Sequence, residues 1–162
     1  MKQRNKRLLS WLAAAAWMVV IFLFSAQTGD ESGDTSGAIV RWVMGLIYPG
    51  FEGLAEARQM EILEFWHTVI RKGAHFTEYA ILAVLVANAI RPYPIPERPK
   101  WLLPVGVSAL YAVTDEIHQY FVPGRACVAT DVGIDTCGAI FGMVVFALVA
   151  FLRAKSKEGK EG

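Results

Sequence analysis

The residues best suited to chemistry in this chain occur in three short polar motifs, each attached to an apolar stretch. They are RKGAHFTEYAIL at 71–82, TDEIHQYFVPGR at 114–125 and TDVGIDTCGAIFG at 130–142. Histidine and carboxylate side chains can exchange protons near neutral pH, and arginine can hold a phosphate or carboxylate through two parallel hydrogen bonds. The motifs therefore predict either a site for acid/base chemistry and anion binding or an internal network of polar contacts.

Within each motif the polar residues have helical spacing, so they share one face of a helix. These faces comprise Arg71, His75 and Glu78; Asp115, His118 and Gln119; and Asp131 and Asp135. The last face continues through Gly138 and Gly142, a small-xxx-small pattern that lets two helices approach closely. We therefore expect the helices that carry the motifs to pack with their polar faces together.

The surrounding composition is typical of a membrane protein. The chain has 162 residues, of which 54% are hydrophobic, and its mean hydropathy is +0.36. An ordinary soluble domain of this length needs fewer apolar residues to fill its core. The net charge is only +1 and the sequence has no basic tract suited to a polyanion, so nucleic acid is not an expected partner.

Four stretches approach the length of about 20 apolar residues that a bilayer-spanning helix needs. They are 8–26, 74–90, 101–121 and 132–152. The segment 37–48 is apolar but contains Arg41, which favours an amphipathic helix on the membrane surface or a re-entrant helix. We expect one domain over residues 1–162, an all-α polytopic membrane helix bundle of four transmembrane helices with this segment on its outer face.

Two features predict where these helices begin and end. The segment before residue 74 has amphipathic spacing, so the second span is expected to continue backward as an interfacial helix. The segment RPYPIPERPK at 91–100 is rich in proline and is expected to form a tight loop, with the third span beginning near Pro104.

Basic residues near the span ends predict the orientation, because Lys and Arg stay preferentially in the cytoplasm. They form three clusters: Lys2, Arg4, Lys6 and Arg7; Arg91, Arg98 and Lys100; and Arg153, Lys155, Lys157 and Lys160. All three clusters predict a multi-pass protein of the cytoplasmic membrane with both termini in the cytoplasm. The three polar motifs then meet in the outer leaflet.

The candidates for proton transfer are His75, Glu78, Asp115 and His118, because each imidazole has a carboxylate within one or two helical turns. A structural network of hydrogen bonds between helices explains the same pattern, since an unpaired ionisable group in hydrocarbon costs about 2.5–3.5 kcal/mol. Ligand types for a metal are present, but the H-E-x-x-H spacing is not, so neither a metal nor a cofactor is predicted.

The candidates for anion binding are the three cations of the motifs. Arg71, Lys72 and Arg125 are suited to a phosphate or carboxylate, the arginines especially. The alternatives are that these side chains anchor the protein among outer headgroups or pair with Asp131.

The three motifs in this order, together with FSAQTG at 24–29, resemble the VanZ-like membrane protein family over residues 24–142. The resemblance implies a small multi-span bacterial membrane protein, and the family's namesake is linked to reduced susceptibility to the glycopeptide teicoplanin. Residues that match the family by position are Arg71, Lys72, His75, Glu78, Tyr79, Asp115, Glu116, His118, Gln119, Arg125, Asp131, Gly138 and Gly142. This chain departs from the family at Asp135, where the family commonly has Asn, a neutral hydrogen-bond donor.

Two classes of function are consistent with these residues. The first is an envelope protein that binds a phospholipid, a lipid-linked precursor or a lipoglycopeptide at the outer leaflet. Its ligand-binding residues would be Arg71, Lys72, Glu116, Gln119, Arg125 and Asp131. The second is a membrane-embedded enzyme that moves a proton or phosphoryl group on a lipid-linked substrate. A small transporter is disfavoured, because transporter sites lie near the bilayer midplane and these polar groups lie at one end.

Overall fold

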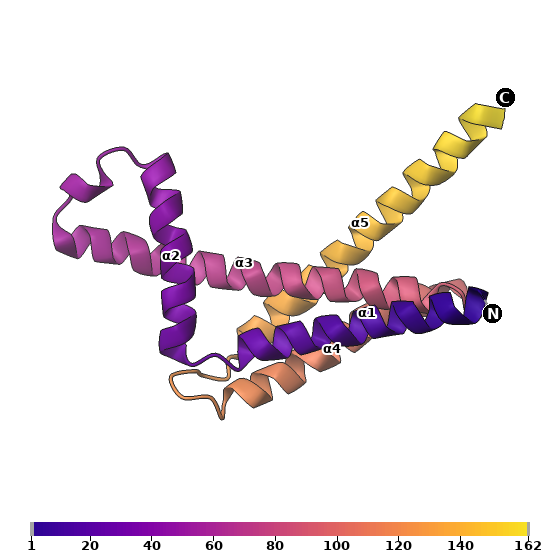
Figure 1. The fold of residues 1–162 in the computed structure, drawn as a ribbon, viewed down its shortest axis with the longest axis horizontal. Coiled ribbons are helices and arrows are strands. Elements are labelled where there is room, and N and C mark those ends of the chain that lie inside the picture. Colours follow the sequence, from indigo (N-terminus) through magenta and orange to yellow (C-terminus); the bar gives the residue numbers. More distant parts are fainter. Residues whose placement is uncertain (1, 162) are drawn as a thin grey trace.

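The computed structural model describes residues 2–161, and within them every regular element is helical. The elements are α1 (Lys2–Ser25), α2 (Gly29–Ile47), the short 3-10 helix η1 (Phe51–Gly53), α3 (Glu56–Ile90), α4 (Glu97–Gln119) and α5 (Ala129–Glu161). The helices α1, α3 and α4 pack side by side, α2 crosses α3 beyond the end of α1, and α5 packs against α3 and α4 before its second half diverges from the rest (Figure 1). The all-α prediction is confirmed.

Three of these helices are long and apolar enough to cross a membrane. The qualifying segments are Gln3–Ser25, Glu56–Ile90 and Ala129–Lys157, which correspond to three of the four predicted spans. Within the described chain, α4 does not qualify by the same measure. The reason is that charged residues occupy both of its ends, Glu97 in the first turn and Asp115 and Glu116 near the last, so its apolar stretch is short.

Two helix boundaries depend on the local sequence. The helix α3 has 35 residues and is about 52 Å long at 1.5 Å per residue, so it exceeds the about 30 Å of a bilayer core. Its first part extends beyond α2 (Figure 1), as expected for an interfacial continuation. The helix α4 begins at Glu97 and not near Pro104, so the predicted loop 91–100 is partly helical. Pro99 lies in the first turn, where its missing N–H needs no partner.

The helices α3 and α5 touch through glycines. A Cβ atom at Gly138 would overlap the backbone carbonyl of Phe76, and one at Gly142 would overlap that of Ala80. Side chains larger than hydrogen would therefore hold the two backbones apart. The contact continues into a buried cluster of Ala83, Ala87, Ala139 and Met143. The predicted close helix contact at the two glycines is confirmed.

The helix α2 is longer than the predicted segment 37–48, because a capping box starts it at Gly29. Glu31 N donates to Thr28 Oγ1 over 3.3 Å, and Thr28 N donates to Glu31 Oε2 over 2.9 Å. The backbone N–H of Thr28 and then its hydroxyl lower the pKa of Glu31. The helix buries Val40 while Trp42 is 69% exposed, and it lies across α3 beyond the end of α1 (Figure 1), an arrangement that favours a surface helix over a re-entrant one.

The turn between α1 and α2 is fastened to the turn between α4 and α5. Gly29 N donates to Pro123 O over 3.0 Å, and a Cβ atom at Gly29 would overlap the carbonyl of Gly124. Gly124 has a φ of +74°, in the left-handed region that glycine adopts without steric penalty. These turns close the end of the bundle at which the three polar motifs lie.

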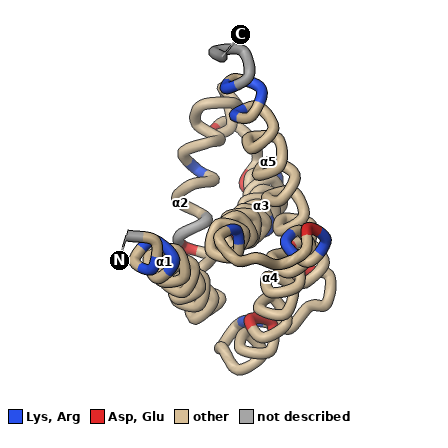
Figure 2. The backbone as a smooth tube through the Cα atoms, turned by 90° about the vertical axis from the view of Figure 1, so that its right-hand side faces the viewer, with Lys and Arg blue, Asp and Glu red and all other residues tan. Residues whose placement is uncertain are grey.

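Basic residues gather at the opposite end. Figure 2 views the molecule from that end, with Lys and Arg at the start of α1, around the turn between α3 and α4, and toward the end of α5. Arg7 Nη2 donates to Pro92 O over 3.1 Å, and its guanidinium carbon lies 5.1 Å from the ring centre of Tyr93. The side chains of Lys2 and Lys160, which also belong to the predicted basic clusters, lie outside those that the structure describes.

Candidate functional site

A cavity of about 240 Å³ opens between the end of α1, α2, α3 and the turn that joins α4 to α5. Its polar wall consists of Gln27, Ser32, Arg71, His75, Glu78 and Arg125, and its apolar wall of Phe24, Ile39, Ile70 and Ala74. We call this space the outer cavity, after the leaflet that the basic clusters of the sequence predict for this end of the bundle. A site for a small organic ligand is usually lined by apolar side chains and a small number of polar groups that point toward the ligand.

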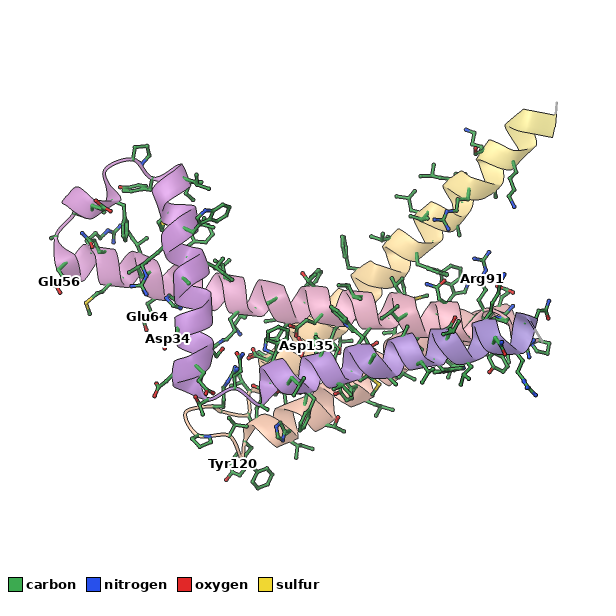
Figure 3. All side chains as sticks on the ribbon, in the orientation of Figure 1. Asp34, Glu56, Glu64, Arg91, Tyr120 and Asp135 are labelled. Carbon is green, nitrogen blue, oxygen red and sulfur yellow. The ribbon has the colours of Figure 1, made fainter. Side chains whose placement is uncertain are left out.

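His75 lies between two carboxylates at the back of the outer cavity. Its Nδ1 is 4.0 Å from Glu78 Oε2 on the same helix and 4.0 Å from Asp135 Oδ1 on α5. Both distances exceed the about 2.7–3.2 Å of a hydrogen bond, and this nitrogen and both oxygens of Asp135 are buried without a hydrogen-bond partner. Asp135 is 1% exposed and lies inside the bundle (Figure 3). A shift of about 1 Å would bring His75 within hydrogen-bond range of either carboxylate.

Asp115 links the polar faces of α3 and α4. It is 4% exposed, and Gln119 Nε2 donates to its Oδ2 over 3.2 Å. Among the described residues, Asp115 Oδ1 and the buried hydroxyl of Ser25 at the end of α1 have no hydrogen-bond partner, and the charges of His75 on α3 and His118 on α4 act on the Asp115 carboxyl group. The end of α1 and the last turns of α4 thus meet the middle of α3 at one buried carboxyl group.

Lys72 and Asp131 form an ion pair between α3 and α5. Lys72 Nζ lies 2.5 Å from Asp131 Oδ1, and the two side chains are 33% and 19% exposed. Of the three cations considered as partners of Asp131, Lys72 therefore takes this place. Both were also predicted to bind a ligand, but neither lines the outer cavity.

Arg125 holds the end of α1 as well as lining the outer cavity. Its Nε donates to Gln27 O over 3.1 Å, and its Nη2 lies 3.5 Å from Phe24 O, so it ties the turn after α4 to the chain at the end of α1. Burial lowers the pKa of the Arg125 guanidinium and the nearby Arg71 lowers it further, while two neighbouring carboxylates oppose the shift. A guanidinium stays protonated despite such shifts, so Arg125 supplies a fixed positive charge.

Glu116, His118 and Gln119 do not line the outer cavity. Glu116 Oε2 accepts a hydrogen bond from Val128 N over 2.7 Å, which holds the turn before α5. The rings of His118 and Phe22 lie 4.5 Å apart between centres, and His118 Nε2 is buried without a partner. None of these three side chains reaches the outer cavity, so the predicted roles of Glu116 and Gln119 in ligand binding and of His118 in proton transfer stay predictions.

Two hydrogen bonds and one buried polar residue were not predicted from the motifs. Trp17 Nε1 donates to Glu78 O over 2.9 Å, the hydroxyl of Tyr111 donates to a backbone carbonyl of α1 over 2.7 Å, and Ser25 is 1% exposed beside the polar cluster. Ser25 and Gln27 belong to FSAQTG, so the sequence resemblance contained a signal for them. Nothing in the sequence distinguishes Trp17 from the other tryptophans.

The arrangement favours binding of an anion with an apolar attachment. Four of the predicted site residues line the outer cavity, namely Arg71, His75, Glu78 and Arg125. The other predicted site residues do not line it. In residues 2–161 no group of three or more His, Cys, Asp and Glu side chains is arranged to hold a metal ion.

Comparison with known proteins identifies one family. A family model described as VanZ/LLP1 matches residues 10–150, a range that contains all three polar motifs and FSAQTG. No curated protein and no solved structure matches the chain.

Proposed function

The chain belongs to the VanZ/LLP1 family, and we propose that it binds the anionic headgroup of a lipid or lipid-like amphiphile at the outer leaflet of the cytoplasmic membrane. The observation that carries this proposal is the outer cavity, where two arginines face an apolar wall. The sequence resemblance adds a context, cell-envelope function and tolerance to teicoplanin-type glycopeptides.

The proposed topology has four spans, with α4 as the fourth and both termini in the cytoplasm. Three helices have the length and composition of spans, and α4 packs against α3 and α5 with Ser108 and Ala112 buried. In Figure 1, α1 and α4 run in one direction and α3 and α5 in the other. The basic residues at one end support a cytoplasmic location of that end, and the outer cavity would then face the opposite leaflet.

The size of the outer cavity decides which part of a ligand it holds. Pockets that enclose a drug-sized ligand measure about 300–1,000 Å³, whereas this cavity measures about 240 Å³. It accommodates a headgroup but not a whole glycopeptide. Tolerance to such an antibiotic would then arise from action on a lipid or lipid-linked precursor, whose chains extend past Phe24 and Ile39 into the bilayer.

Arg71 and Arg125 have different parts in this proposal. Two nitrogens of Arg125 already donate to backbone carbonyls, so Arg125 contributes mainly positive charge and has fewer free hydrogen-bond donors for a ligand. Arg71 is exposed and its planar guanidinium can form two parallel hydrogen bonds with a phosphate. The headgroup would therefore be held mainly by Arg71.

A binding measurement tests the proposal. Protein in maltoside detergent is titrated with dodecyl phosphate, a single-chain anionic amphiphile, and the affinity is followed by calorimetry. We expect Arg71→Gln to weaken binding about 10-fold or more, because a hydrogen bond to a charged group contributes about 1.5–3 kcal/mol. The matched control is Arg58→Gln, which removes an exposed arginine of the same helix that does not line the cavity. Equal losses in both variants, or no loss in Arg71→Gln, would overturn the proposal.

Acid/base chemistry on a phosphorylated lipid is the second candidate function, and it is favoured by one observation. His75 lines the outer cavity and its Nδ1 stands between two carboxylates. A general base must reach its proton directly or through one water, and a headgroup in the cavity would lie beside this imidazole.

Product analysis separates the two candidates. Wild-type protein and His75→Gln are incubated with a polyprenyl diphosphate, and released phosphate is measured. Release that depends on His75 would support an enzyme that hydrolyses the diphosphate with water. Tight binding with no release would support the binding function.

A further inference from the structure

A second cavity, of about 780 Å³, lies between α3 and α5 at the end of the bundle opposite the polar motifs. It forms where α5 diverges from α3 (Figure 1). Its basic side chains are Arg91, Arg153 and Lys157, and its apolar wall includes Val84, Val145, Phe146 and Val149. We call this cavity the basic groove.

The three basic side chains of the groove have no acidic partner among the described residues. Other cations of the chain do, since Lys100 Nζ lies 2.8 Å from Glu97 Oε1 and Lys72 pairs with Asp131. The backbone carbonyls at the end of α3 carry partial negative charge and cannot hold an anion. The positive charge on the groove must therefore come from Arg91, Arg153 and Lys157.

We infer that the basic groove binds an anionic phospholipid, with the phosphate held by the basic side chains and an acyl chain along the apolar wall. The volume falls within the about 300–1,000 Å³ of sites that enclose a small organic ligand. Val145 and Val149 are 40% and 39% exposed on its wall, and an acyl chain would cover them, whereas a free phosphate would not. Basic pockets between membrane helices are the recurring form of sites for anionic headgroups.

This inference is independent of ligand binding in the outer cavity and requires only that the helices are embedded in a membrane. In the proposed orientation the groove faces the cytoplasmic leaflet, whose anionic lipids attract basic residues close to the bilayer. The lipid would fill the space that the divergence of α5 opens beside α3.

Lipid retention tests the inference directly. Protein in maltoside detergent is mixed with phosphatidylglycerol or phosphatidylcholine, and bound lipid is counted by native mass spectrometry. Wild-type protein is expected to retain phosphatidylglycerol in preference, and Arg91→Gln/Arg153→Gln to bind it about 30-fold more weakly, from the loss of two charges. Arg98→Gln/Lys155→Gln is the matched control, because it removes two basic residues at the same end that do not line the groove.

Each outcome is decisive for the groove. An equal loss of bound phosphatidylglycerol in the two double variants would show that binding depends on the overall charge of this end, and it would overturn the inference. Equal retention of phosphatidylglycerol and phosphatidylcholine by the wild-type protein would also overturn it. Displacement of phosphatidylglycerol by millimolar inorganic phosphate would show that the groove is a site for a free anion, and this result would also overturn the inference. If the first double variant does not fold, Lys157→Gln replaces it and is compared with Lys155→Gln. Because the outer cavity can also hold an anionic headgroup, retention by the groove is counted in the Arg71→Gln background, where the preference for phosphatidylglycerol and its loss in Arg91→Gln/Arg153→Gln should both persist.

Discussion

The imidazole Nδ1 of His75 on α3 lies 4.0 Å from Oδ1 of Asp135 on α5, one turn before Gly138 brings the two backbones together. His75 lines the outer cavity, and Asp135 is 1% exposed. The contact therefore couples the cavity wall to the packing of two helices. Changes at these two residues distinguish support of the fold from a role in the site.

Asp135→Asn should stabilise the protein. Both carboxylate oxygens are buried without a hydrogen-bond partner, and an amide removes the charge while adding two donors beside His75 and Glu78. We expect a gain of about 1 kcal/mol, which raises the melting temperature by about 2–4 °C. Thermal unfolding in detergent measures it. A loss of similar size would mean that an ionised Asp135 is paired with a protonated His75.

The two histidines of the polar cluster should respond differently to truncation. His75→Ala should weaken dodecyl phosphate binding and lower glycopeptide tolerance with little change in melting, because its side chain lines the cavity. His118→Ala should lower stability by about 0.5–1.5 kcal/mol through loss of its contact with Phe22, and tolerance only in step with folded protein. Full tolerance and full binding in His75→Ala would exclude this residue from the site.

Adding a methyl group to either glycine of the α3–α5 contact should destabilise the protein. Gly138→Ala and Gly142→Ala would drive a Cβ atom into the carbonyls of Phe76 and Ala80, and overpacking of this kind costs about 1–3 kcal/mol. Gly133→Ala on the same helix is the control, because nothing lies within 4 Å of its Cβ position. Unchanged melting of both test variants in detergent would show that this face of α5 points to lipid.

The proposed topology predicts which engineered cysteines react in intact cells. Cys127 and Cys137 are both free and exposed, so they are first replaced by Ser. Pro94→Cys, between α3 and α4, should then be shielded from a membrane-impermeant maleimide, whereas Asp34→Cys on α2 should react; both positions are exposed in the structure itself. The reverse labelling pattern would show that the protein has the opposite orientation in the membrane, with the outer cavity on the cytoplasmic side.

Helical periodicity was sufficient to predict which polar residues share a helix face and which glycines make a helix contact. The spacing of Asp131, Asp135, Gly138 and Gly142 puts all four on one side of α5, and α3 lies against that side. Residues three or four positions apart share one face of any α-helix, because this spacing follows from the backbone geometry and does not depend on the neighbouring helices.

Boundaries and partners depended on contacts that periodicity does not contain. The early start of α2 arises from the capping box of Thr28 and Glu31, whose Thr-x-x-Glu pattern is a local signal that the apolar spacing of residues 37–48 does not contain. The choice of Lys72 as the partner of Asp131 depends on the rotation of α3 against α5. The distance of His118 from the cavity wall depends on its packing against Phe22.

A structure determined with dodecyl phosphate bound tests the central claim most directly. We expect the phosphate in the outer cavity, within about 3 Å of a guanidinium nitrogen of Arg71 and beside His75, with the alkyl chain leaving past Phe24 and Ile39. A phosphate bound only between Arg91 and Arg153, with none in the outer cavity under saturating amphiphile, would contradict it.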